Sequence, residues 1–149
     1  MFAELIPGYM KELDENAGRV HRPEWAQKWA NSMIDIQGAL DRHLELCYAN
    51  GNLVGFLYGK RDHDEHRGYI RPGWGYIMEL YVLPKYRRNG YGKLMYERLV
   101  CLFRKDGVKS IYLTADPVTG KPFWEAMGFI NTGEKSSENN LDIYEKNLD

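Results

Sequence analysis

The feature that most constrains the fold is a junction in the middle of the chain, where an apolar run meets a basic turn. Residues 76–83 (YIMELYVL) contain a single acidic or basic side chain, Glu79, and predict a β-strand covered on both faces. The turn after it, LPKYRRNGYGK, has four basic residues, no acidic residue and two glycines. Residues 91–105 then place apolar side chains at helical spacing. A strand, a glycine turn and a helix in this order predict an anion site at the helix N-terminus.

The elements around this junction follow from periodicity and turn residues. Before it, we expect two helical segments and a β-hairpin: residues 2–17, interrupted at Pro7-Gly8, residues 23–40, and strands 44–49 and 53–58 around Asn50-Gly51-Asn52. After it, we expect strand 108–114, helix 119–127 and strands 129–132 and 141–144. This order predicts one α/β (α+β) domain over residues 1–149, with a mixed sheet and at least one parallel crossover.

Charge and cysteine content limit the function classes. The net charge is −1, which disfavours a nucleic-acid binder and gives no general attraction to an anionic membrane. No apolar run approaches the ~20 residues that cross a bilayer, and the first residues do not resemble a signal peptide. Cys47 and Cys101 have no spacing typical of zinc or disulfide sites. We therefore expect a soluble protein of the cytoplasm with reduced thiols.

The spacing of the glycines separates this turn from two common phosphate-binding loops. Lys93 is followed by Leu94 rather than by the Ser or Thr of a nucleoside triphosphate loop, and Met95 stands where a dinucleotide loop has its third glycine. The turn does match Arg/Gln-x-x-Gly-x-Gly/Ala, as Arg87 to Gly92, after a strand and Pro84. This pattern resembles the acetyl-CoA signature of the GNAT N-acetyltransferase superfamily. The alternative is a solvated loop with a glycine turn.

The resemblance extends from about Tyr76 to Tyr144 and implies a fold, a co-substrate and a reaction. The implied fold is a twisted, mostly antiparallel sheet with flanking helices and a splayed central strand pair. The implied co-substrate is acetyl-CoA, without a metal. The implied reaction is direct acetyl transfer to a primary amine of a small molecule or amino-acid-like acceptor. A protein N-acetyltransferase and a non-catalytic acyl-CoA-binding or regulatory module are the alternatives, and a homodimer is a family-level expectation.

The resemblance also assigns residues to the cofactor. The backbone of the motif strand would pair with the pantetheine arm, the turn would wrap the pyrophosphate, and two aromatic residues of the last helix would contact the cofactor. These residues are Leu80, Tyr81 and Val82; Arg87, Arg88, Asn89, Gly90, Tyr91, Gly92 and Lys93; and Phe123 and Trp124.

Glu79 is the candidate catalytic base, because it lies on the strand just before the pantetheine-pairing segment and burial would raise its pKa. The alternative is that Glu79 points to an edge or binds substrate without taking a proton. A backbone N–H near Leu80 to Val82, where the strand would bulge and splay, is the expected oxyanion donor.

The chain departs from the family pattern at three places. Trp124 stands where the family often has a tyrosine that protonates the leaving thiolate, and an indole has no accessible acid function. Asp116-Pro117 stands near the position of a frequent asparagine. Residues 1–6 are short for the family's first strand, so that strand would be missing or rudimentary, which leaves a sheet edge free for a partner.

The segment His63-Asp64-Glu65-His66 has two further interpretations. Two histidines three residues apart suggest a metal-binding interaction domain, but a solvated loop fits the same pattern. Its acidic residues, with Asp62, are also placed to attract a cationic amine.

Overall fold

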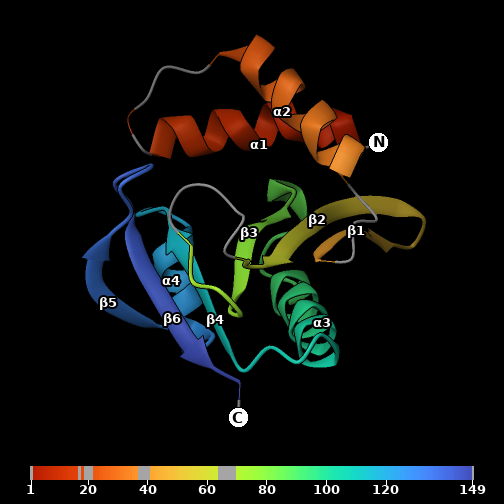
Figure 1. The fold of residues 1–149 in the computed structure, drawn as a ribbon. Helices are drawn as coiled ribbons and strands as arrows, with labels where there is room; N and C mark the ends of the chain where they lie inside the picture. Colours follow the sequence, from red (N-terminus) through yellow and green to blue (C-terminus); the bar gives the residue numbers. More distant parts are fainter. Residues whose placement is uncertain (1, 17, 19–21, 37–40, 64–69, 149) are drawn as a thin grey trace.

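The computed structural model describes residues 2–16, 18, 22–36, 41–63 and 70–148. Six strands form one sheet in the order β1-β2-β3-β4-β6-β5, flanked by helices (Figure 1). In chain order the elements are α1 (Phe2–Asn16), α2 (Pro23–Ile36), β1 (Arg42–Ala49), β2 (Asn52–Arg61), β3 (Gly75–Val82), the 3-10 turn η1 (Pro84–Tyr86), α3 (Tyr91–Lys105), β4 (Ser110–Ala115), α4 (Gly120–Ala126), β5 (Ile130–Lys135) and β6 (Asp142–Asn147). All neighbours pair antiparallel except β3 and β4. The predicted mixed, mostly antiparallel fold is therefore confirmed.

The hairpin that the sequence predicts is present and longer than expected. Asn50 and Gly51 both have positive φ angles, of 52° and 80°, as a two-residue turn between twisted strands requires. From this turn β1 and β2 pair as far as Arg42 and Lys60. A bulge lies between Cys47 and Tyr48.

Helix α1 runs through Pro7 without interruption, so the predicted break at Pro7-Gly8 is wrong. Proline removes one helical hydrogen bond and strains the preceding turn. Burial compensates for this loss, because Leu5, Ile6 and Tyr9 of α1 pack into a cluster with Phe56 of β2 and Tyr81 of β3. Among the described residues no strand precedes α1, as the sequence suggested. Helix α2 is described to Ile36, so the predicted extension to residue 40 lies outside the described residues.

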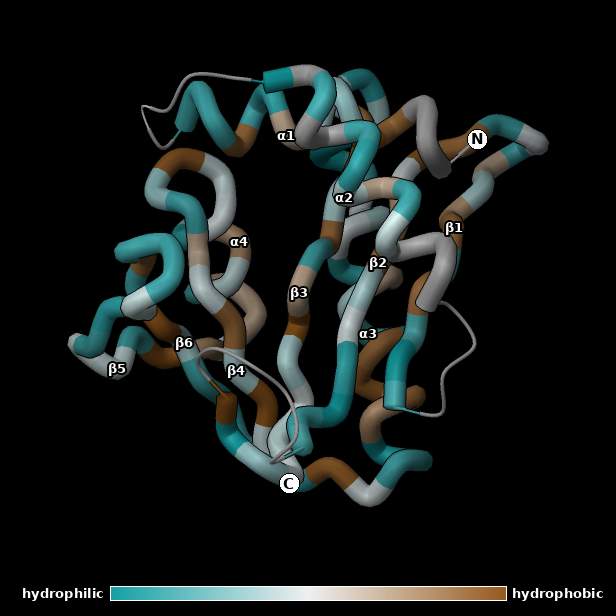
Figure 2. Tube along the Cα trace, turned by 45° about the horizontal axis from the view of Figure 1, so that its top comes forward, coloured by the Kyte–Doolittle hydropathy of each residue, from teal (hydrophilic) through white to brown (hydrophobic). Residues whose placement is uncertain are grey.

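Strands β3 and β4 touch only at one end. Their parallel pairing is limited to Gly75 with Ile111 and Tyr76 with Tyr112, after which the strands diverge toward α1 (Figure 2). The rings of Tyr76 and Tyr112 stack at that end, with centroids 4.7 Å apart and planes 6° from parallel. The resemblance predicted a splayed central pair, and the structure places the splay directly after this stacked pair.

Two apolar clusters on opposite faces of the sheet hold the helices. The cluster of α3 and α4 contains Leu99, Phe103 and Trp124 together with Leu113 of β4. The cluster of α1 and α2 contains Tyr9 and Ala30 together with Tyr81 of β3. At the splayed end of β3, Leu80 and Val82 pack with the first cluster and Tyr81 with the second, so both clusters border the splay. Within the described residues, no helix has the length and apolar composition needed to cross a membrane.

Substitution of Gly55 tests how closely β2 approaches the splayed end of β3. A Cβ atom at Gly55 would lie 2.0 Å from the Tyr81 carbonyl oxygen, and backbone cannot move aside as a side chain can. We expect Gly55→Ala to lower the free energy of unfolding by about 1–3 kcal/mol in urea denaturation. The matched control is Gly8→Ala in α1, where a new Cβ meets no atom within 4 Å. That change should leave stability unchanged or raise it by up to about 1 kcal/mol. Equal stability of the two variants would contradict the close strand approach.

Candidate active site

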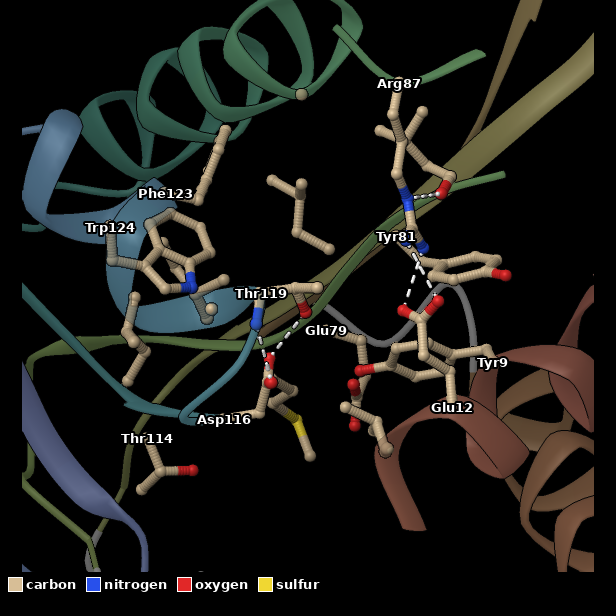
Figure 3. A pocket seen from close by; sticks show the side chains of 18 of the residues that line it. Tyr9, Glu12, Glu79, Tyr81, Arg87, Thr114, Asp116, Thr119, Phe123 and Trp124 are labelled. Carbon is tan, nitrogen blue, oxygen red and sulfur yellow. Dashed lines mark hydrogen bonds and ion pairs between the residues drawn. The ribbon is translucent and has the colours of Figure 1, made fainter. Parts of the chain in front are cut away.

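A cavity of about 570 Å³ opens along the splay between β3 and β4. Its walls come from β3, from the turn and first residues of α3, from β4 and α4, and from α1 (Figure 3). The cavity therefore lies where the divergence of two strands leaves backbone groups without a neighbouring strand. It includes Glu79 and every residue that the sequence assigned to the cofactor except Asn89.

The N-terminus of α3 faces this cavity. Gly90, Tyr91, Gly92 and Lys93 line it, and the first helical hydrogen bond runs from the Leu94 N–H to the Gly90 carbonyl. The N–H groups of the first turn have no helical acceptor and are available to an anion. Gly90 has a φ of 84°, a conformation that favours glycine. Gly92 is needed for packing, because a Cβ there would lie 2.9 Å from the Phe123 ring.

Arg87 binds within the protein rather than pointing freely into the anion site. Its guanidinium donates to both carboxylate oxygens of Glu12 in α1, at 2.9 and 2.8 Å, and its Nε donates to the Val82 carbonyl at 2.9 Å (Figure 3). Its backbone N–H is bonded to the Pro84 carbonyl at 3.2 Å. Arg87 therefore positions the turn, whereas Arg88 and Lys93 line the cavity with no acidic partner among the described residues.

Asn89 stabilises the same turn from outside the cavity. Its side-chain amide donates to the carbonyl oxygens of Tyr86 and Arg87, at 3.1 and 3.0 Å. Arg88 beside it has a φ of 64°, which is uncommon for a residue other than glycine. The predicted contact of Asn89 with pyrophosphate stays a prediction, and the structure shows a role in holding the loop.

The backbone of β3 offers donors to the splay. The Leu83 N–H donates to Val54 of β2 at 2.8 Å, and Tyr81 pairs with Phe56 of β2. Alternate residues of a strand point their N–H groups to the same side, so Leu80 and Val82 point theirs away from β2, toward the gap. The β2–β3 register shifts between Tyr58 and Gly59, which leaves Met78 as the extra residue of the bulge. The bulge thus comes two residues before the segment where the sequence analysis expected it.

Glu79 lies on β3 and lines the cavity between the two arms of the splay (Figure 3). Desolvation by the surrounding protein raises the pKa of its carboxyl group well above the ordinary value of 4.5. No described residue forms an ion pair or a hydrogen bond with it. Tyr9 of α1 points into the same part of the cavity and packs on Tyr81, with ring centroids 4.7 Å apart. Glu79 is therefore a half-buried carboxyl group of the cavity wall, with no partner among the described residues.

Trp124 lines the cavity from α4 as part of an aromatic cluster. Its ring meets those of Tyr96, Phe123 and Phe129 edge-on, at centroid distances of 5.8, 4.8 and 5.2 Å. The residue is 8% exposed. Its place in the cavity wall fits the expectation that it packs against a ligand rather than acting as an acid.

Sequence reasoning expected the first helices to contribute to the acceptor site but named no residue of α1. Asn16 donates to Asp116 Oδ1 at 3.1 Å, and Glu12 holds Arg87, so α1 is bonded to both arms of the splay. Asp116 also accepts the N–H groups of Val118 and Thr119, each at 3.0 Å, which organises the turn before α4. The stripe Tyr9, Glu12, Leu13, Asn16 at helical spacing is the one signal in the sequence, and it resembles any amphipathic helix.

Asp62 does not attract a substrate, so that prediction is wrong. Its side chain is buried, accepts a hydrogen bond from the Tyr112 hydroxyl and lies 3.4 Å from the Lys60 ammonium group. The Arg71 N–H donates to it at 2.9 Å. Asp62 therefore stabilises the closed end of the splay, because Tyr112 is the residue that stacks on Tyr76.

The remaining acidic and metal predictions for this segment fall mostly on Asp64, Glu65 and His66, which lie outside the described residues. His63 Nε2 lies 3.5 Å from Asp41. Within the described ranges, no three His, Cys, Asp or Glu side chains converge as metal ligands.

Solved structures of several acetyltransferases superpose on this chain. A GNAT protein of Staphylococcus aureus Mu50 superposes with a TM-score of 0.73 at 17% identity, covering 99% of this chain and 94% of that one. The PaiA N-acetyltransferase of Thermoplasma acidophilum, solved with coenzyme A, superposes with a TM-score of 0.68 at 19% identity, covering 97% of this chain and 92% of that one. An aminoglycoside 6′-N-acetyltransferase, also solved with coenzyme A, superposes with a TM-score of 0.69 at 12% identity, covering 99% of this chain and 91% of that one. At these identities the likeness shows the fold alone. Comparison with curated proteins gives no match.

The family itself is shown by the sequence model of the Acetyltransferase (GNAT) family, which matches residues 9–129. The matched range contains every residue that lines the cavity except Asn139 and Leu141. The chain belongs to the GNAT acetyltransferase family.

Proposed function

We propose that this chain is an acetyl-CoA-dependent N-acetyltransferase that transfers the acetyl group directly to a primary amine of a small molecule or amino-acid-like acceptor. One observation carries the proposal: in the described part of the chain, one cavity contains backbone N–H groups without a helical acceptor, two basic side chains without an acidic partner and one carboxyl group whose pKa burial raises. The N–H groups and the basic side chains suit the phosphates of a thioester co-substrate, and the carboxyl group suits a catalytic base.

Two free cysteines agree with a cytoplasmic location. A homodimer stays a family-level expectation.

The α3 end of the cavity fits the pyrophosphate of coenzyme A. This end has three first-turn N–H groups and the positive end of the helix dipole, and Arg88 and Lys93 line it. Leu80 and Val82 direct backbone groups toward the same space, although the Val82 carbonyl already accepts from Arg87. We infer that the pantetheine arm lies along this segment of β3.

Bound acetyl-CoA would supply an acetyl thioester as the acyl donor. Glu79 takes a proton from the ammonium form of the acceptor, which leaves a neutral nucleophile. An N–C bond then forms, the thioester C–S bond breaks, and a second amine proton ends on the sulfur. The Leu80 or Val82 N–H donates to the carbonyl oxygen as it gains negative charge, an effect worth about 3–4 kcal/mol for one preorganised donor. Trp124 takes no part as an acid, because an indole N–H donates a hydrogen bond and keeps its proton.

A non-catalytic acyl-CoA-binding module is the second candidate, and the position of Trp124 in the wall favours it. Such a module would bind coenzyme A tightly and release no thiol with any amine. A protein N-acetyltransferase is the third candidate. Acetylation of peptides in preference to small amines would support it.

Free-thiol release with a panel of primary amines tests the activity, and Glu79→Gln tests the base. Burial raises the pKa of Glu79 above 4.5, so the rate should rise with pH as this group loses its proton, on a limb that lies above pH 4.5. We expect Glu79→Gln to lower kcat/KM about a hundredfold or more and to abolish this limb. Glu97→Gln, an exposed position on α3, is the matched control. An active Glu79→Gln enzyme with unchanged pH dependence would exclude the base role.

The same substitution has a consequence for stability that needs no substrate. Because folding raises the pKa of Glu79, the folded chain binds a proton more tightly than the unfolded chain, and stability falls as pH rises through the interval between the two pKa values. Glu79→Gln has no charge to desolvate. We expect it to be more stable than wild type at neutral pH, with the difference shrinking toward pH 4, as followed by thermal unfolding. A difference independent of pH would show that the carboxyl group is not desolvated.

Removal of single charges tests the pyrophosphate site. We expect Arg88→Ala and Lys93→Ala each to raise the KM for acetyl-CoA by up to about fivefold, since an exposed ion pair contributes about 0.2–1 kcal/mol. Lys85→Ala is the control, because Lys85 belongs to the same basic turn but does not line the cavity. The effect should weaken with added salt. An equal change in all three variants would indicate a general charge effect instead of a site.

A further inference from the structure

We propose that Glu12 of α1 is a positioning residue for coenzyme A: acting through Arg87, it holds the basic turn in the shape that receives the pyrophosphate. This inference rests on the proposed function, because it takes the α3 end of the cavity as the coenzyme A site. It adds to that site a residue that lies 75 positions before Arg87 in the chain and outside the family motif.

The Arg87 guanidinium is held from three directions (Figure 3). Its two terminal nitrogens donate to the two carboxylate oxygens of Glu12, at 2.9 and 2.8 Å, and its Nε donates to the Val82 carbonyl at 2.9 Å. It also lies over the Tyr81 ring, 5.4 Å from the ring centroid. Two parallel hydrogen bonds to one carboxylate fix the plane of a guanidinium, which a single contact does not. Glu12 therefore sets the orientation of Arg87.

The backbone of the basic turn depends on how Arg87 is held. The Arg87 N–H donates to the Pro84 carbonyl at 3.2 Å, and the Arg87 carbonyl accepts from the Asn89 side chain at 3.0 Å. The next residue, Arg88, has a φ of 64°. A residue other than glycine keeps a positive φ only where the contacts around it impose that conformation. The Arg87 side chain supplies contacts of this kind, because it ties the turn to β3 and to α1.

Helix α1 has other attachments that keep it in place. Ile6 and Tyr9 are buried in its apolar cluster, and Asn16 near its end donates to Asp116 at 3.1 Å. The Glu12 side chain lies between these attachments and is 25% exposed. Loss of the Glu12 carboxylate therefore removes a contact to the turn and leaves α1 packed on the sheet.

The sign of the effect on affinity distinguishes positioning from simple electrostatics. Glu12 is a negative charge in the wall of a cavity that is proposed to hold a pyrophosphate. On charge alone, its removal would release the Arg87 charge and tighten the binding of an anion. If Glu12 positions the turn, its removal weakens that binding, although the site becomes more positive.

Isothermal titration of coenzyme A tests the inference without any turnover. We expect Glu12→Ala to raise the Kd about threefold or more, since residues of one salt-bridge network couple by such factors. In an Arg87→Ala background the same change should alter the Kd by less than about twofold, because the residue through which Glu12 acts is absent. If Arg87→Ala binds too weakly to titrate, Arg87→Lys provides the background, because lysine lacks the fork that takes both oxygens of Glu12.

Glu15→Ala is the matched control, because Glu15 is an exposed glutamate of the same helix that does not line the cavity. It should leave the Kd unchanged. With an amine that supports thiol release, Glu12→Ala should raise the KM for acetyl-CoA by the same factor as the Kd. Its kcat at saturating acetyl-CoA should stay within about twofold of wild type. This split is the result expected of a residue that acts on cofactor binding and not on the chemical step.

The outcomes distinguish this inference from the function on which it rests. Tighter or unchanged binding of coenzyme A by Glu12→Ala overturns the inference and leaves the acetyltransferase proposal intact. An equal loss of affinity in the Arg87 background also overturns it, because that pattern indicates a general loosening of α1. No thiol release with any primary amine, together with the expected pattern of affinities, overturns the acetyltransferase proposal and leaves the positioning role in place. Absence of coenzyme A binding by the wild-type protein overturns both.

Discussion

The short contact between β3 and β4 is the constraint on which the rest of the site depends. At one end the stacked rings of Tyr76 and Tyr112, with the buried Asp62 bonded to the Tyr112 hydroxyl, hold the two strands together. Beyond that pair the strands separate, and backbone groups of β3 have no neighbouring strand on that side. Unpaired backbone groups are tolerated only where water or a ligand can reach them. The splay therefore produces a cavity lined with hydrogen-bond donors.

Helix α1 turns this gap into an enclosed site. It bonds to one arm through Glu12 and Arg87 and to the other through Asn16 and Asp116. These contacts also decide which charged groups of the cavity have a partner inside the protein. Among the described residues, Arg87 pairs with Glu12, whereas Arg88 and Lys93 have no acidic partner and Glu79 has no hydrogen-bond partner. The proposed function requires an anionic donor at the α3 end of this cavity and a cationic acceptor near Glu79.

Local patterns predicted most of the fold. The α3 range was predicted without error, the hairpin turn at Asn50-Gly51 was correct, and the strand, helix and strand around the basic turn were all found. The errors have physical causes. Pro7 was read as a break, because burial of Ile6 and Tyr9 is a tertiary effect that local propensity does not contain. Asp62 was read as a surface charge, because its partner Tyr112 lies 50 residues away. The residues that the sequence assigned to a cofactor, except Asn89, line one cavity, but none of them lies on α1, since its stripe of residues is typical of any amphipathic helix.

The sequence by itself determined the order of the elements, the family motif at Arg87 to Gly92, and the single carboxylate of the apolar strand at Glu79, because each is a matter of residue type and spacing along the chain. Only the tertiary structure decided which of these groups are free to act. Arg87 belongs to the motif, yet its guanidinium is bonded to Glu12, which is 75 residues away, whereas Glu79 has no partner at all among the described residues. Whether a charge is available to a ligand depends on which other charges reach it in space, and that is settled by the packing of α1 across the splay.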